Sequence, residues 1–106
     1  KESKCEACTI DAPLVSDSEA KVLLLELDGW IIGSDSGINQ LIKTYKFSNY
    51  AESLDFSNKV ADLAESEDHH PKIVLEYGSV EVSWWSHKIK GLHKNDFICA
   101  AKTDLI

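Results

Sequence analysis

The chain lacks any apolar run of about 18 residues or more, the length that a membrane-spanning helix needs. Its first residues, Lys1 to Lys4, precede no apolar stretch, so no secretory signal peptide is expected. Cysteine is scarce as well, because only Cys5, Cys8 and Cys99 occur. An odd and low number of cysteines argues against a disulfide scaffold and favours reduced thiols. We therefore expect a cytoplasmic protein that does not enter membranes.

Positive charge is also in short supply. The sequence has 11 lysine and arginine residues against 18 aspartate and glutamate residues, so the formal net charge is 11 − 18 = −7. Because an acidic chain repels phosphate backbones, nucleic acid is not an expected partner. One short basic patch is a local exception, and a solvated loop and helix start is its favoured interpretation. The patch comprises His87, Lys88, Lys90, His93 and Lys94.

Length and apolar content set the number of domains. Apolar residues make up 43% of the 106 residues, which is enough for one folded core. A domain of this size buries limited surface, so association with further copies would add stability. We therefore expect one domain over residues 1–106, with an irregular lead-in over 1–15, that forms a homo-oligomer.

Capping and turn residues divide the chain into seven elements. Ser16 is placed to cap a first helix, and Gly29 is typical of a helix end. A second helix, capped by Ser48 or Asn49, must end near residue 68, because Pro71 disfavours helical geometry in the residue before it. The expected elements are helices at 16–29, 49–68 and 94–105, and strands at 30–32, 38–47, 73–77 and 80–86.

The order of these elements predicts the fold class. Helices and hairpins in the order αββαββα, with turns at 33–37 and 78–79, indicate an α+β fold. Its four-stranded antiparallel sheet should carry the helices packed on one face. Residues that should share one face are Val80, Val82 and Trp84 in the last strand, and Phe97, Ala101 and Leu105 in the last helix.

Three histidines are the candidate chemical groups. His69 and His70 are adjacent at the predicted helix end, where Pro71 stops the chain from continuing as a helix. Adjacent side chains on a helix diverge, but at a helix-to-strand turn both can face one cleft. His87 follows the last strand, close to Trp85. Taken separately, the pair is typical of a solvated surface, and His87 of a packed, hydrogen-bonded side chain.

Several motifs follow one another over most of the chain: Glu65-x-x-Asp68-His69-His70-Pro71, Tyr77, Val80-x-Val82, His87 and Gly91-Leu92-x-x-x-Asp96. This pattern resembles the pterin-4a-carbinolamine dehydratases over about residues 16–105. The lead-in and the Trp84-Trp85-Ser86-His87 segment are similar to the bacterial branch of that family, whose members often accompany phenylalanine hydroxylase. The sequence departs from the pattern at Ile73, where many members have an aromatic residue, and at His93, where many have a helix-capping serine or threonine.

The resemblance implies an enzyme that removes water from a 4a-hydroxytetrahydropterin. The product is a quinonoid dihydropterin, and the reaction recycles the pterin cofactor of aromatic amino-acid hydroxylation. An acid must protonate the leaving hydroxyl and a base must take a ring-nitrogen proton, and histidine suits both tasks near neutral pH. No cofactor is implied, because the pterin is the substrate. The implied catalytic residues are His69, His70 and His87; Asp96 and Glu65 support them, and His70, Pro71 and Trp85 contact the pterin.

The division of labour among the histidines follows from the same resemblance. His69 and His87 are the expected acids, acting from different sides of the ring, while His70 orients the pterin. Because all three side chains are expected to face a cleft rather than the core, replacing any of them by alanine should leave the fold intact.

Two other interpretations stay open. Three histidines and an acidic residue could hold zinc, and Cys5-x-x-Cys8 could add to this, although a structural zinc site wants two such pairs. The other alternative is a non-catalytic binding module that acts as a dimerisation or transcription cofactor, as vertebrate members of the family do for a homeodomain factor. The expected partners are the pterin substrate, further copies of the chain in a dimer or tetramer, and phenylalanine hydroxylase as a functional link.

Overall fold

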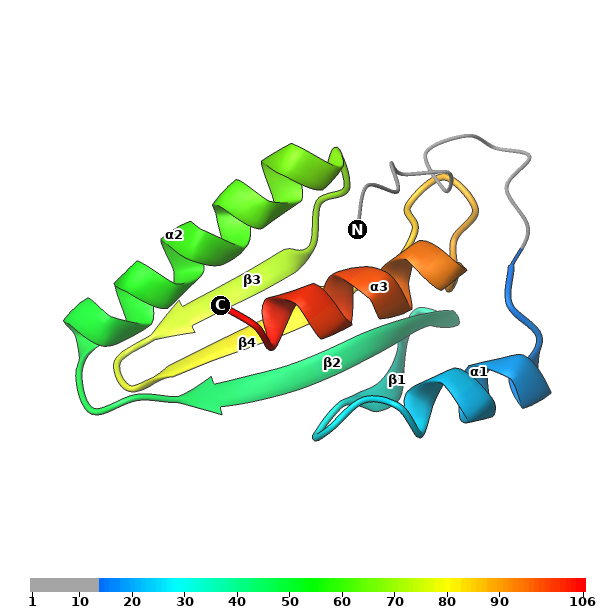
Figure 1. Ribbon diagram of the computed structural model, residues 1–106, viewed down its shortest axis with the longest axis horizontal. Coiled ribbons are helices and arrows are strands. Elements are labelled where there is room, and N and C mark those ends of the chain that lie inside the picture. Colours follow the sequence, from blue (N-terminus) through cyan, green and yellow to red (C-terminus); the bar gives the residue numbers. More distant parts are fainter. Residues whose placement is uncertain (1–13) are drawn as a thin grey trace.

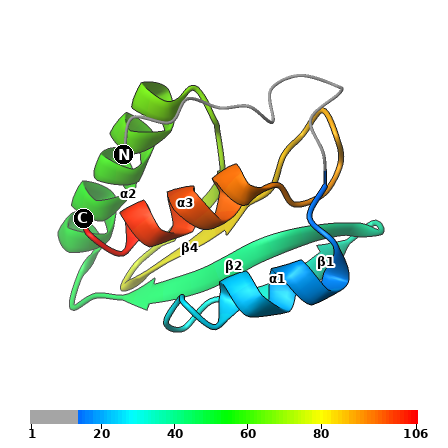
Figure 2. The same cartoon turned by 45° about the vertical axis from the view of Figure 1, so that its right-hand side comes forward.

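The computed structural model describes residues 14–106, which form one sheet with three helices over a single face (Figure 1, Figure 2). All strand pairs are antiparallel, and the strand order is β1-β2-β4-β3. The predicted α+β fold and the element order αββαββα are therefore confirmed. The elements are α1 (Asp17–Leu24), β1 (Ile31–Asp35), β2 (Ile38–Lys46), α2 (Tyr50–Glu67), β3 (Lys72–Glu76), β4 (Ser79–Trp84) and α3 (Lys94–Thr103).

The first helix is shorter than predicted. It starts as expected, because the Ser16 hydroxyl accepts a hydrogen bond from the Glu19 amide at 3.1 Å. It ends at Leu24 rather than near Gly29, because the amides of residues 26 and 27 bond to carbonyls three residues back and tighten the last turn. Gly29, with a φ of 84°, instead turns the chain towards β1.

The first hairpin is tighter than the sequence suggested. Asp35 pairs with Ile38, so the turn consists of Ser36 and Gly37 alone, with φ of 56° and 81°. Two central residues with positive φ match the right-handed twist of the flanking strands. The predicted five-residue loop at 33–37 was therefore wrong, and β1 extends through it.

The second hairpin turns one residue earlier than predicted. Glu76 pairs with Ser79, which leaves Tyr77 and Gly78 as the turn in place of residues 78–79. Gly78 has a φ of 79°, a conformation that glycine adopts without steric cost. The strands β3 and β4 are shifted accordingly but keep their predicted pairing.

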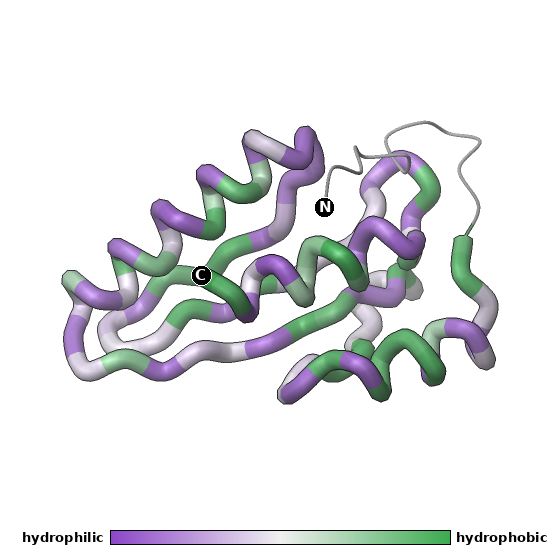
Figure 3. The backbone as a smooth tube through the Cα atoms, in the orientation of Figure 1, coloured by the Kyte–Doolittle hydropathy of each residue, from purple (hydrophilic) through white to green (hydrophobic). Residues whose placement is uncertain are grey.

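The core lies between the sheet and the helices. Val80, Val82 and Trp84 have no exposed surface, which confirms that they share the buried face of β4. The helix α2, capped by Asn49, contributes Val60 to the same core, and hydrophilic and hydrophobic residues alternate along its turns (Figure 3). None of the helices within residues 14–106 is both long and apolar enough to cross a bilayer.

The buried face of α3 differs from the predicted one. Phe97 is buried as expected, but Ala101 and Leu105 are exposed. Ala100 and Thr103 take the inner positions instead, and the Thr103 hydroxyl accepts a hydrogen bond from the Trp84 indole at 3.0 Å. The predicted helix ran too far, because α3 ends at Thr103 and Leu105 lies beyond it.

A polar cluster fastens the end of α3 to the sheet. Asp104 accepts hydrogen bonds from the Trp30 indole at 3.0 Å, from the Lys43 amine at 2.8 Å and from the Tyr45 hydroxyl. Burial alone would raise the pKa of the Asp104 carboxyl, but these donors outweigh it and hold the pKa below its usual value of 3.8. The cluster therefore contains an ionised carboxylate at neutral pH.

Candidate active site

Three segments meet at the end of the sheet where α2 finishes (Figure 1). They are the turn at 68–71 between α2 and β3, the loop at 85–93 between β4 and α3, and the first turn of α3. Asp68 caps α2 in the left-handed conformation, with a φ of 54°, and so reverses the chain direction before the histidine pair. The sequence motif around His69 and His70 therefore begins at a helix end, as predicted.

His69 points into the protein rather than into an open cleft. Its side chain is 4% exposed and stacks on the Trp84 indole, with ring centroids 5.5 Å apart and an interplanar angle of 20°. Its Nε2 lies 2.6 Å from Oδ1 of Asp96. The expectation that all three histidines face a cleft was wrong for His69, because the chain turns it against the core.

Asp96 is fully buried and is held at both oxygens. Oδ1 contacts His69, while Oδ2 accepts hydrogen bonds from the Ser86 hydroxyl at 2.8 Å and from the His93 amide at 2.9 Å. Because both partners of Oδ2 donate, that oxygen carries no proton, and any proton shared with His69 lies between Oδ1 and Nε2. Asp96 also lies in the first turn of α3, where the helix dipole favours negative charge.

His93 provides the cap of α3 that serine or threonine provides in many relatives of this motif. Its Nδ1 accepts a hydrogen bond from the Asn95 amide at 3.0 Å, and Asp96 closes the capping box through the His93 amide. The departure at this position therefore leaves the helix start intact.

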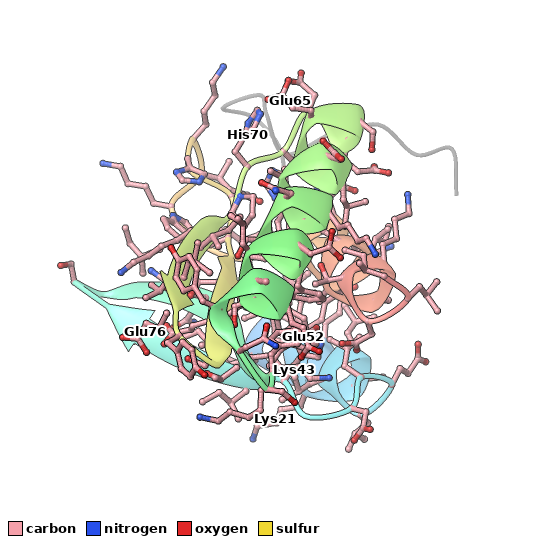
Figure 4. The ribbon with its side chains drawn as sticks, turned by 90° about the vertical axis from the view of Figure 1, so that its left-hand side faces the viewer. Lys21, Lys43, Glu52, Glu65, His70 and Glu76 are labelled. Carbon is pink, nitrogen blue, oxygen red and sulfur yellow. The ribbon has the colours of Figure 1, made fainter. Side chains whose placement is uncertain are left out.

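His70 diverges from its neighbour and points outward. Its Nε2 lies 2.9 Å from Oε2 of Glu65, and the two side chains meet beside the last turn of α2 (Figure 4). Both are well exposed, at 56% for His70 and 80% for Glu65. An exposed pair of this kind contributes at most about 1 kcal/mol to stability, so its effect is to orient the imidazole.

His87 is exposed and approaches the histidine pair from the other segment. Its Nε2 donates a hydrogen bond to the His70 carbonyl at 2.9 Å, because a carbonyl oxygen only accepts. Its ring packs against Trp85 at a centroid distance of 4.5 Å. The structure thus brings the three histidines into one region, with His69 buried and His70 and His87 exposed.

The other predicted site residues lie at the edges of this region. Pro71 and Trp85 are half-buried; Pro71 directly follows His70, and Trp85 lies two residues before His87. Ile73, which replaces an aromatic residue of the family pattern, packs against the hydrophobic core opposite Val82.

Sequence reasoning missed the role of Ser86, which contacts Asp96. A serine just after two tryptophans at a strand end is the one signal that could have pointed to it. Two cavities, of about 700 and 460 Å³, lie beside α1 and beside the start of α2. No histidine lines either cavity.

Metal binding has no preformed ligand set in the described part of the chain. Within residues 14–106, no three histidine, cysteine or acidic side chains come together as ligands would. His69 is directed at Asp96, while His70 and His87 lie outside that contact. The Cys5-x-x-Cys8 motif lies outside the described residues.

A family model and the sequences of similar proteins point to the same family. Residues 13–106 match the family model described as pterin 4 alpha carbinolamine dehydratase. Provisionally named pterin-4-alpha-carbinolamine dehydratases include one from Vibrio vulnificus strain YJ016, 60% identical over 105 residues that cover 99% of this chain and 96% of that protein. Another, from Saccharophagus degradans, is 60% identical over 100 residues, covering 94% and 88%.

Two solved structures are similar in fold. One is described as a transcriptional coactivator/pterin dehydratase from Brucella melitensis, with a TM-score of 0.78, 28% identity, and coverage of 88% of this chain and 97% of that chain. The other is a pterin dehydratase-like protein described as a RuBisCO assembly factor in the alpha-carboxysome, with a TM-score of 0.61, 22% identity, and coverage of 74% and 88%. At that identity the second shows likeness of fold alone.

Proposed function

The chain belongs to the pterin-4a-carbinolamine dehydratase family, and on that premise we propose that it removes water from a 4a-hydroxytetrahydropterin to give a quinonoid dihydropterin. The observation that carries this proposal is the set of three histidines from two segments, one of them paired with a buried carboxylate. No observation on residues 14–106 favours a non-catalytic binding module instead.

The reaction breaks one C–O bond and one N–H bond. An acid donates a proton to the 4a-oxygen, which leaves as water, and a base takes the proton of a ring nitrogen, so no proton is gained or lost overall. His69 and His87 are the proposed acids, and His70, oriented by Glu65, holds the pterin and shares in proton transfer.

The Asp96 carboxylate suits His69 to this role. A buried carboxylate with Oδ1 2.6 Å from Nε2 fixes the ring plane, so His69 is the most firmly positioned of the three. With 4% of its surface exposed, His69 offers the substrate only a small part of its ring. His87 is exposed and approaches from the loop after β4, so the two acids arrive from different elements.

A direct assay of 4a-hydroxytetrahydropterin dehydration tests the proposal. We expect the purified protein to accelerate the reaction without added metal, flavin or nicotinamide. Absence of acceleration would refute the proposal, and activity that is lost on chelation and restored by zinc would replace it with a metal mechanism.

Separated stereoisomers of the substrate test the assignment of the acids. His87→Ala and His69→Gln should each retain measurable activity, with opposite preferences for the two isomers, and the double variant should lose far more than the product of the single losses. The variant Glu65→Gln, which disturbs His70 rather than either proposed acid, should lower activity towards both isomers alike. Complete loss of activity towards both isomers in either single variant would mean that one histidine is the sole acid.

The proposal extends to the setting in which the enzyme acts. The proposal includes a homo-oligomer, which is supported by the sheet order, because β1 and β3 are edge strands and Ile31 on β1 is 61% exposed. Light scattering at micromolar protein should give a mass above that of one chain, and a monomer would contradict this. An aromatic amino-acid hydroxylase, such as phenylalanine hydroxylase, is the proposed source of the substrate, and the cytoplasm the proposed location.

A further inference from the structure

We propose that Ser86 is a positioning residue for the reaction: its hydroxyl locks the Asp96 carboxylate in the one orientation that holds His69. This inference rests on the proposed dehydratase function for its kinetic consequence only. The geometric part concerns three buried side chains and is independent of the substrate. Ser86 itself need not touch the pterin.

The carboxylate of Asp96 has two unequal ends. Oδ1 lies 2.6 Å from the His69 imidazole, and Oδ2 receives the Ser86 hydroxyl at 2.8 Å and the His93 amide at 2.9 Å. The His93 amide is part of the capping box of α3 and is fixed by the backbone. Among the contacts found within residues 14–106, the Ser86 hydroxyl is the side-chain donor to Oδ2, and it restricts the rotation of the carboxylate about its Cβ–Cγ bond.

Ser86 is itself held in place by the backbone. Its amide donates to the Gly91 carbonyl at 2.8 Å, and its carbonyl accepts from the Gly91 amide at 3.3 Å, which closes the loop between β4 and α3. The Ser86 side chain is fully buried, so water does not compete for its hydroxyl. A donor with a fixed backbone and no solvent access imposes its geometry on its acceptor.

The position of Ser86 also links the two proposed acids. It directly precedes His87, and its hydroxyl contacts Asp96, which is the partner of His69. One hydroxyl at the base of the loop thus connects the buried histidine with the segment that carries the exposed one. Without it, Oδ2 keeps a single donor, and the carboxylate can rotate away from the imidazole.

The test compares serine variants on the same strand end. Ser86→Ala removes the hydroxyl, Ser86→Thr retains it, and Ser83→Ala is the matched control, because Ser83 is also buried, at 1% exposure, but does not contact Asp96 among the described contacts. We expect Ser86→Ala to lower kcat by about 10- to 100-fold with little change in KM, as loss of an orienting hydrogen bond does. Ser86→Thr should recover most of the rate, and Ser83→Ala should resemble the wild type.

Nuclear magnetic resonance of the His69 imidazole gives a readout that does not depend on turnover. Ser86→Ala should shift the ring nitrogen and Nε2–H proton resonances of His69, while Ser83→Ala leaves them in place. Unchanged His69 resonances in a folded Ser86→Ala variant would overturn the inference. So would a rise in KM at constant kcat, which would make Ser86 a substrate contact. An inactive wild type would refute the proposed function, and the resonances would still decide the positioning role.

Discussion

Replacing His69 by alanine should destabilise the protein much more than replacing either of the other two histidines. The side chain is 4% exposed and is the partner of a carboxylate with no exposed surface. Its removal leaves Asp96 buried with its charge uncompensated at Oδ1, a change that costs about 3–5 kcal/mol in comparable buried pairs. Loss of the ring stack on Trp84 adds roughly 0.5–1.5 kcal/mol.

These losses are large compared with the stability of an ordinary domain, about 5–15 kcal/mol. His70→Ala provides the matched control, since it removes an imidazole that also faces a carboxylate but on the surface. That pair is 56% and 80% exposed, so its loss should cost less than about 1 kcal/mol. The sequence alone predicted that the fold would tolerate both changes equally, and the burial of His69 separates them.

Urea unfolding followed by tryptophan fluorescence measures the difference, with all variants at one protomer concentration. Adding Asp96→Ala to His69→Ala should cost less than the sum of the two single changes, because the double variant contains no unpaired buried carboxylate. A His69→Ala variant whose unfolding free energy lies within about 1 kcal/mol of the wild type would refute the reasoning. It would mean that water or a rearranged side chain satisfies Asp96.

Three further outcomes are expected. Burial raises the pKa of the Cys99 thiol to about 12, with Glu67 and Asp96 adding to the effect, so at pH 8 its thiolate fraction is about 10⁻⁴ against about 10⁻¹ for a pKa of 9.0. Mass spectrometry should show iodoacetamide labelling of Cys99 only after unfolding, and fast native labelling would contradict this. Asp104→Asn should lower the urea midpoint at pH 7, and this deficit should shrink as the pH falls below 3.8 and disappear once the pH passes the lowered pKa of Asp104, because a depressed carboxyl pKa contributes stability only above it; a deficit that does not shrink below pH 3.8 would argue otherwise. Cys5→Ser combined with Cys8→Ser should leave the dehydration rate unchanged, and loss of the rate with the fold intact would assign these thiols a catalytic role.

The local patterns that predicted the fold are those that burial enforces. Alternation along β4 placed Val80, Val82 and Trp84 on one face, and all three are fully buried. The cap at Asn49 and the proline at residue 71 bracketed α2 correctly. Where a choice depended on turn geometry, as at Gly29 or at residues 33–37, the sequence offered several glycines and serines of equal suitability. Pairing of Asp35 with Ile38 then decided the turn.

The sequence predicted that the candidate site residues lie close together, but not how deeply each is buried. The motif assigned His69, His70, His87 and Asp96 to one region, and the hydrogen bonds connect them. The two adjacent histidines diverge, one against the core and one into solvent. This divergence depends on the Trp84 indole, which lies beside the turn because of the way in which the sheet and α2 pack. Such a tertiary contact cannot be predicted from the residues that neighbour the histidines in the sequence.

The polar cluster at Asp104 bears on the order in which the chain can fold. The hydrogen bond from Trp30 to Asp104 joins residues 74 positions apart in the sequence. During synthesis the β1–β2 hairpin therefore leaves the ribosome well before Asp104, the residue to which it is hydrogen-bonded. Forming these hydrogen bonds closes a long segment of chain, which has an entropic cost. Removal of the Asp104 side chain should consequently slow the last part of folding as well as lower the stability, because it removes the contact that joins these distant segments.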